Sequence, residues 1–442
     1  MGGFHSGGSG CSTIRNANFD YLLRLNMQRR HLLQRVLALP IVGLSSEAIA
    51  DDFGASKGYL SGWPPLNERG GQPVPWTNSD YLVGNMSGGM ESLFKHSVVK
   101  AKGQAAELIS RPVAFRLDGK TDFANYQRRF GKTAVLVARG STVYYENYEF
   151  SRTADMRFYS KSMAKGVLSL LAGLALEHGV LDSLDDPIEK YDGRLKGKPL
   201  GSVKLRHALN MSSGVDMCQL GCGQRNDYER WEEPAFLGSG RRRTFATDAD
   251  KVAIDWPWGF SHPSGTRFNY SHVDPHLVGM AIRGGAGQSL AKFTEKALWQ
   301  PMGAQSDALW FTDSQGSEEV GGSFSATLRD WGRIGLLVAN KGGVNGKQVI
   351  RESWLQTYRN FKDDEGYLKP GNIPNKGGKE GYKNFLHLPQ INSSWLRFGG
   401  DLGQSIYIDQ KSGAVMVVLS VSNQTGQQIY EDLFRSSLAT LG

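Results

Sequence analysis

The alternation of hydrophobic and polar positions predicts two β-hairpins in this chain. Residues 132–148 contain two runs rich in β-branched and aromatic side chains, 134–137 and 143–145, on either side of the turn 139–141. Two such runs separated by a short glycine-containing turn are typical of antiparallel strands. The second hairpin has strands at 405–408 and 414–419 around the turn 411–413.

Other stretches predict helices. The run 167–181 is almost wholly apolar, so a helix there must be buried on most sides. Ser289 precedes an amphipathic stretch and is placed to cap it. The other predicted helices are 205–211, 290–298, 327–339 and 429–439.

Strand patterns occur towards both ends of the chain and are weak between residues 166 and 288. This arrangement predicts one discontinuous α/β lobe, formed by 111–165 and 289–442, with an inserted helical lobe at 166–288. An active site would then lie between the two lobes. Residues 51–110 are rich in Gly, Pro and Trp and are expected to form an extended arm.

Length and charge narrow the possibilities further. The chain has 442 residues, which is too long for one hydrophobic core and suits two lobes with a leader. Its 51 Lys and Arg against 43 Asp and Glu give a net charge of +8, which is too small to indicate nucleic-acid binding. The basic run 241–243 is flanked by glycine and is interpreted as a solvated loop.

Residues 1–50 indicate a leader with a twin-arginine signal peptide. Residues 2–10 are low-complexity, and Gln28-Arg29-Arg30-His31 begins a twin-arginine n-region. The apolar segment 36–44 is too short for a stable membrane anchor, and Ala48-Ile49-Ala50 has the small-x-small pattern of a cleavage site. We therefore expect a periplasmic or secreted protein.

Two of the three cysteines lie close together in the sequence. Cys11 belongs to the leader, whereas Cys218 and Cys222 are four residues apart. An oxidising compartment allows these two to form a disulfide, and two free thiols are the alternative. A zinc site would need two further ligands at suitable spacing, which the neighbouring sequence lacks, so we expect no metal.

Ser162 and Lys165 are the strongest candidates for chemistry. Three residues apart on a helix, they share one face, so the lysine can reach the serine hydroxyl. A helix N-terminus also supplies backbone N–H groups for an oxyanion. Serine and lysine have the same spacing at Ser92, Ser97 and Ser289, but only Ser162 leads into an almost wholly apolar helix. The alternative is that Ser162 simply starts a core helix.

Four motifs in a fixed order carry a family resemblance. They are Ser162-Met-Ala-Lys165, Val203-Lys-Leu-Arg-His-Ala-Leu-Asn-Met-Ser-Ser-Gly-Val215, Ser264-Gly-Thr-Arg-Phe-Asn-Tyr270-Ser-His272 and Gly403-Gln-Ser-Ile-Tyr-Ile-Asp409. Over roughly residues 80–440 the chain resembles serine hydrolases related to class C β-lactamases, most of all the 6-aminohexanoate-dimer hydrolases and their esterase relatives. The resemblance implies a β-lactamase/transpeptidase-like α+β fold, with a mainly antiparallel sheet flanked by helices beside an all-α lobe. It also implies a catalytic Ser, Lys and Tyr, and we expect no cofactor.

The resemblance assigns the family's tyrosine to Tyr270. Its phenol, beside the Lys165 ammonium, can protonate the leaving group and later activate water, and the general base is either Lys165 or Tyr270. A plain core tyrosine is the alternative. In the β-lactamases the residue two positions further on is usually Asn, but here it is His272. That Asn donates to the lysine and to substrate. Imidazole can fill the same hydrogen-bonding role, and it adds a pH dependence.

The family's remaining element is a strand edge, Lys-Thr-Gly in β-lactamases, which we place at Phe398-Gly399-Gly400-Asp401. Glycines suit a strand that substrate must approach closely, so Gly399, Gly400 and Asp401 are expected to bind substrate. The oxyanion hole would consist of the backbone N–H groups of Ser162 and Asp401. If the alignment shifts, Gln404 takes the place of Asp401, and a plain surface turn is the other interpretation.

These residues predict a serine hydrolase that cleaves linear amides or carboxylic esters through an acyl-enzyme. The missing lysine and the presence of Asp401 disfavour a β-lactam carboxylate, although Arg397 could supply a cation. The alternatives are a β-lactamase or DD-peptidase and, from another class, a non-catalytic binding protein of the same fold. The expected partner is a small amide or ester, with no nucleic acid and no stable membrane anchor.

Overall fold

The computed structural model describes most of the chain after residue 85. The described residues are Met86, 89–102, 104–117, 121–217, 248–360, 380–390, 393–421 and 427–441. The predicted leader and signal peptide, and the pair Cys218 and Cys222, lie outside these residues and stay predictions.

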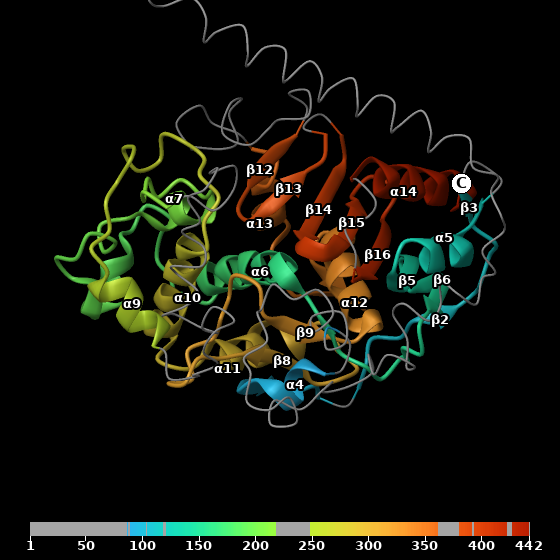
Figure 1. Cartoon of the computed structure of the whole chain (residues 1–442), viewed down its shortest axis with the longest axis horizontal. Helices are drawn as coiled ribbons and strands as arrows, with labels where there is room; N and C mark the ends of the chain where they lie inside the picture. Colours follow the sequence, from blue (N-terminus) through green and yellow to red (C-terminus); the bar gives the residue numbers. More distant parts are fainter. Residues whose placement is uncertain are drawn as a thin grey trace, which may run out of the picture. The chain divides into compact units, whose positions relative to one another are not determined.

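An eight-stranded sheet forms the centre of the fold (Figure 1). Neighbouring strands are antiparallel, except that the edge strand β2 runs parallel to β6. Both predicted hairpins are confirmed, as β5–β6 and β15–β16. In sheet order the strands are β12 (Gly381–Lys383), β13 (Leu386–Leu388), β14 (Trp395–Gly400), β15 (Gln404–Asp409), β16 (Ala414–Ser420), β5 (Lys132–Arg139), β6 (Thr142–Tyr148) and β2 (Ile109–Ser110).

Successive side chains of a strand point to opposite faces of the sheet, and here both faces are buried under helices. On β5, Leu136 joins the core under helix α12 (Leu328–Ala339), whereas Val135 and Val137 join a second core with Phe434. Phe434 belongs to helix α14 (Gln427–Leu441), which covers that second face together with α5 (Phe123–Arg129). The sheet is therefore flanked by helices, as predicted.

A smaller antiparallel sheet was not predicted. Its order is β1 (His96–Val99), β8 (Ala308–Phe311), β9 (Phe324–Ala326) and β7 (Phe158–Tyr159). Strands of two to four residues are too short to show a clear alternation, so their pattern does not stand out in the sequence. The short strand β7 leads directly into the turn that carries Ser162, so this sheet helps to fix that turn.

Helix α6 (Ala164–Glu177) is the predicted apolar helix, and every residue from Ala164 to Ala175 is buried. It begins three residues before the predicted start and ends earlier than predicted, because Gly179 follows with a φ of 67°. Figure 1 shows α6 crossing the middle of the fold, with α7, α9 and α10 on one side and β14, β15 and β16 on the other. Its N-terminus therefore lies where the helical part and the large sheet meet.

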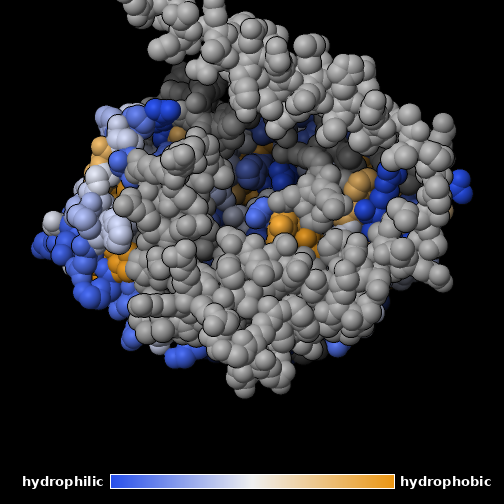
Figure 2. Space-filling model, viewed as in Figure 1, coloured by the Kyte–Doolittle hydropathy of each residue, from blue (hydrophilic) through white to orange (hydrophobic). Residues whose placement is uncertain are grey.

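The described residues between 166 and 288 contain helices and no named strand, in agreement with the weak strand pattern there. The predicted division into two lobes stays a proposal. Figure 2 shows a mainly hydrophilic surface on the side where Figure 1 places α9. Trp256, directly after α9, is exposed. The helices here and just beyond are α7 (Leu205–Leu209), α9 (Ala249–Asp255), α10 (Val273–Ala286), α11 (Leu290–Thr294) and the π-helical η6 (Glu295–Trp299).

The remaining elements are short. Within the described part of the chain, none of the helices has the length and apolar character needed to cross a membrane. The remaining short elements are α4 (Met90–Leu93), β3 (Arg116–Leu117), β4 (Thr121–Asp122), η3 (Lys161–Met163), η4 (Ile188–Lys190), η5 (Gly193–Leu195), β10 (Gly343–Val344), β11 (Lys347–Gln348), α13 (Glu352–Thr357) and η7 (Asp401–Gly403).

Candidate active site

Ser162 lies in the 3-10 turn η3, directly before α6, and its side chain is half-buried. The preceding residue, Lys161, has a φ of 47°, a left-handed conformation that costs a non-glycine residue on the order of 1 kcal/mol. Two hydrogen bonds hold the turn against β9: Ser160 N donates to Phe324 O (2.9 Å), and Phe324 N donates to Ser160 Oγ (3.0 Å). These bonds fix the backbone next to Ser162, and the half-buried Ser162 side chain remains accessible.

Lys165 is the buried partner of Ser162, with a side chain that is 1% exposed. Its Nζ lies 3.0 Å from Ser162 Oγ and 3.2 Å from His272 Nε2. It also donates to the carbonyl oxygen of Gly321. The predicted contact between Ser162 and Lys165 is thus present, and His272 and the Gly321 carbonyl also contact the lysine nitrogen.

Tyr270 lies on the other side of Lys165. The Lys165 Nζ is 5.0 Å from the centre of the Tyr270 ring, within the range of a cation–π contact. Tyr382 of β12 meets the Tyr270 ring edge to face, with 6.2 Å between the ring centres. The structure therefore brings Tyr270 beside Lys165 and Ser162, so two segments of the chain meet at this point.

His272, directly before α10, is buried and also faces Lys165. Burial lowers its pKa well below the ordinary value, because it disfavours the charged imidazolium, and the positive charges of Lys165 and Lys161 lower it further. His272 is consequently neutral at physiological pH. Its contact is with Lys165, and the predicted contact with substrate stays a prediction.

Glu319 was not predicted from the sequence. Its Oε1 lies 3.8 Å from His272 Nδ1, and its side chain is buried. Burial raises the pKa of this carboxyl, while the Lys165 charge and the backbone N–H groups of Gly321 and Gly322 oppose that rise. A glutamate two residues before a Gly-Gly pair is the only signal in the sequence, and by itself it does not indicate a histidine partner.

The predicted strand edge lies beside the turn that carries Ser162. Gly400 ends β14, and a Cβ added there would lie 2.5 Å from Ser160 O and 3.1 Å from Met163 N. Only glycine allows the strand to approach the η3 turn this closely. Between the described parts of β13 and β14, the one pair of opposed residues is His387 and Arg397, so the Gly399-Gly400 end extends beyond that pairing.

Asp401 follows Gly400 at the start of η7, which contacts η3. Its side chain is exposed. Gln404, the alternative oxyanion donor, lies on β15 opposite Gly400, and its side chain binds the backbone of Ser420. The assignment of the oxyanion hole to the N–H groups of Ser162 and Asp401 stays a prediction.

Arg397 supplies a cation near this edge. It is half-buried, its Nε donates to Ser405 Oγ (3.3 Å), and its guanidinium lies 5.7 Å from the centre of the Tyr407 ring. A Cβ on Gly399 would lie 3.1 Å from Arg397 Nη2, so the guanidinium runs beside Gly399. The strand edge therefore has a positive group next to it as well as Asp401.

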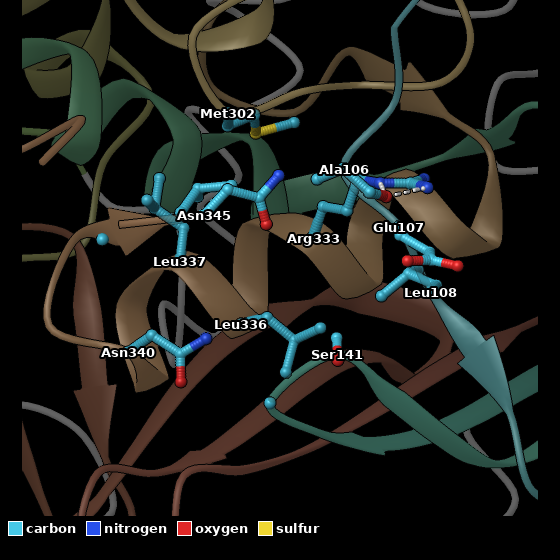
Figure 3. Close-up of a pocket in the computed structure, with 13 residues that line it drawn as sticks. Ala106, Glu107, Leu108, Ser141, Met302, Arg333, Leu336, Leu337, Asn340 and Asn345 are labelled. Atoms are coloured by element: carbon cyan, nitrogen blue, oxygen red, sulfur yellow. Dashed lines mark hydrogen bonds between the residues drawn. The ribbon is translucent and has the colours of Figure 1, made fainter. Parts of the chain in front are cut away.

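A cavity of about 200 Å³ lies elsewhere, and the candidate catalytic residues do not line it. Figure 3 shows it between the β5–β6 turn at Ser141 and the side chains of Leu336, Leu337 and Asn340 on and just after α12. Arg333 at its edge is already bound to Ala106 O and Asp330. Among the described residues, no cluster of His, Cys, Asp and Glu could hold a metal ion.

A half-exposed serine bonded to a buried lysine at the start of a core helix defines a lysine-assisted serine hydrolase site. In agreement, residues 106–439 match the Beta-lactamase family model, and the chain belongs to that family. The predicted fold class and the predicted class of hydrolase are thereby confirmed.

Individual relatives support the same placement. The 6-aminohexanoate-dimer hydrolase of Paenarthrobacter ureafaciens is 22% identical over 319 residues, which cover 69% of this chain and 77% of the relative. A provisionally named 6-aminohexanoate-dimer hydrolase from Bacillus anthracis has a similar fold, with a TM-score of 0.68, 21% identity and coverage of 79% and 91%. A family VIII carboxylesterase has a TM-score of 0.53 at 14% identity, covering 72% and 95%.

Proposed function

We propose that this enzyme hydrolyses linear amides or carboxylic esters through an acyl-enzyme on Ser162. The observation that carries the proposal is the 3.0 Å contact between Lys165 Nζ and the Oγ of a half-exposed Ser162. Serine is a weak nucleophile at neutral pH and reacts when a base lies within hydrogen-bonding distance of its hydroxyl. The geometry supplies such a base within an otherwise buried helix start.

The reaction proceeds in two halves. Ser162 Oγ attacks the substrate carbonyl carbon while its proton passes to Lys165 or Tyr270, and the oxyanion is held by the N–H groups of Ser162 and Asp401. Collapse of the tetrahedral intermediate breaks the bond to the leaving amine or alcohol, which takes up that proton. Water then attacks the acyl-enzyme, gives its proton back through the same base, and releases the acid and Ser162.

Linear substrates are favoured over β-lactams by the residues of the strand edge. The position of the Lys-Thr-Gly lysine is taken by Phe398, which is buried and packs against Gly166 of α6. Asp401 adds a negative charge that would repel a substrate carboxylate and attract an ammonium. The names of the relatives, a 6-aminohexanoate-dimer hydrolase and a carboxylesterase, support the same substrate classes.

A β-lactamase or DD-peptidase is the second candidate, and Arg397 is the observation that favours it. Its guanidinium runs beside Gly399 and could bind a substrate carboxylate. A comparison of kcat/KM for nitrocefin, a p-nitrophenyl ester and the 6-aminohexanoate dimer separates the candidates. We expect the ester or the linear amide to exceed nitrocefin by about ten- to a hundredfold. Preferred turnover of nitrocefin, lost in Arg397→Gln, would favour the second candidate.

We also propose that the enzyme acts outside the cytoplasm. The proposal rests on the twin-arginine pattern at Arg29-Arg30 and the small residues Ala48 and Ala50. The same setting would allow Cys218 and Cys222 to form a disulfide.

A further inference from the structure

Lys165 has three polar neighbours, and their chemistry restricts its protons. The Gly321 carbonyl oxygen can only accept, whereas Ser162 Oγ can donate or accept. A neutral lysine has two N–H donors and one lone pair. If both donors are engaged by acceptors other than Ser162, the lone pair is left directed at the Ser162 hydroxyl, which is the arrangement that a general base needs.

His272 is the second acceptor only in one tautomer. Its Nε2 lies 3.2 Å from Lys165 Nζ, so Nε2 must lack a proton to accept from the lysine. Neutral imidazole then carries its proton on Nδ1, and Nδ1 faces Glu319 Oε1 at 3.8 Å. A nearby carboxylate favours the tautomer with the proton on Nδ1 by charge attraction.

The close approach of these groups depends on Gly321. A Cβ on Gly321 would lie 2.8 Å from Glu319 Oε1 and 2.9 Å from His272 Nδ1, so a side chain there would clash with both groups. The same residue supplies the carbonyl oxygen that accepts from Lys165. The segment from Glu319 to Gly321 therefore contacts both Lys165 and the histidine beside it.

We propose that Glu319 and His272 are positioning residues for the base. Glu319 holds His272 with its proton on Nδ1, so that His272 Nε2 and Gly321 O accept hydrogen bonds from two N–H groups of Lys165. The third position on the lysine nitrogen, a proton in the charged form and the lone pair in the form that acts as base, then points at Ser162. The inference rests on the proposed role of Ser162.

The pH dependence of kcat/KM tests the pair. His272 and Lys165 both face the Glu319 charge, and Lys161 is the other cation close to His272 and Glu319. Glu319→Gln removes a negative charge that favours protonation of the His272 imidazole, and a protonated imidazole cannot accept from Lys165. The acid limb of the profile should therefore move to lower pH by about one unit. The matched control is Glu318→Gln, because Glu318 is also buried but contacts Ala291 N and Arg283 instead. We expect no shift in that variant.

A second pair of variants tests the histidine. His272→Ala removes the acceptor and should lower kcat by about a hundredfold, whereas His272→Asn keeps an acceptor oxygen and should retain activity to within about tenfold of the wild type. Thermal unfolding verifies that each variant folds. An unshifted acid limb in Glu319→Gln, or equal losses in the two His272 variants, overturns the proposal. Labelling of Ser162 by a fluorophosphonate in the wild-type enzyme is measured separately, so failure of the pair is distinguishable from failure of the nucleophile.

Discussion

Lys165 Nζ lies 3.0 Å from Ser162 Oγ, although the serine belongs to the η3 turn and the lysine to the first turn of α6. Because the 3-10 turn η3 continues directly into α6, the two side chains lie within hydrogen-bonding distance of each other. A buried lysine in this position can take the serine proton without competition from bulk water, and several measurable consequences depend on it.

Replacing Lys165 tests its role as the base. Lys165→Arg keeps a positive charge but cannot release a proton at physiological pH, so we expect kcat/KM for a p-nitrophenyl ester to fall by about 10²- to 10⁴-fold. Lys292→Arg is the matched control, since Lys292 has the same three-residue spacing from a serine, Ser289, but pairs with Glu295 instead. Activity of Lys165→Arg close to that of the wild type would remove the lysine from the mechanism.

Gly400→Ala tests the contact between the strand edge and the nucleophile turn. The new methyl group would lie 2.5 Å from Ser160 O, so β14 or η3 must shift. A displacement of this kind at the reacting groups should lower kcat/KM by about a hundredfold. Gly193→Ala is the control, because a Cβ there has no heavy atom within 4 Å. Equal kinetics of the two variants would show that the strand edge does not position the site.

The buried histidines predict how stability depends on pH. Burial and the Arg397 charge lower the pKa of His387 to about 3, and the pKa of His272 is also lowered. In the unfolded chain both titrate near about 6.5, so the unfolded state binds protons that the folded state excludes as the pH falls. The free energy of unfolding should therefore decrease from about pH 7 to about pH 5. Urea denaturation should show a smaller decrease in His387→Gln, and the same decrease in both proteins would contradict this assignment.

The leader predicts where the mature protein begins. Cleavage after Ala50 would give a chain that starts at or near Asp51, because Ala48 and Ala50 are small enough for a signal peptidase. N-terminal sequencing and intact mass of exported protein measure this directly. Soluble cytoplasmic enzyme that retains residues 27–50 would show that the segment is not an export signal.

The sequence is informative where a pattern is local. The hairpins β5–β6 and β15–β16 follow from alternation over several residues, and α6 follows from a long apolar run. The spacing of Ser162 and Lys165 is local in the same sense. Family resemblance adds Tyr270, which no periodicity would have singled out.

Long-range contacts were beyond the reach of the sequence. Glu319 lies 47 residues after His272 in the chain, and the loop containing it is placed by β8 and β9, strands of four and three residues. The sequence also could not predict which charges lie at the strand edge, because the side of β14 on which Arg397 lies depends on the register of the strand pairing. In the structure Arg397 is opposite Tyr407 and runs beside Gly399.

The central claim is that Ser162 is the nucleophile. Incubation with a fluorophosphonate probe, followed by proteolysis and mass spectrometry, should place the covalent adduct on the peptide that contains Ser162. Ser162→Ala should abolish both labelling and turnover, whereas Ser289→Ala, which removes only the cap of α11 at Lys292 N, should retain both. An adduct on a different serine, or substantial turnover by Ser162→Ala, would contradict the account.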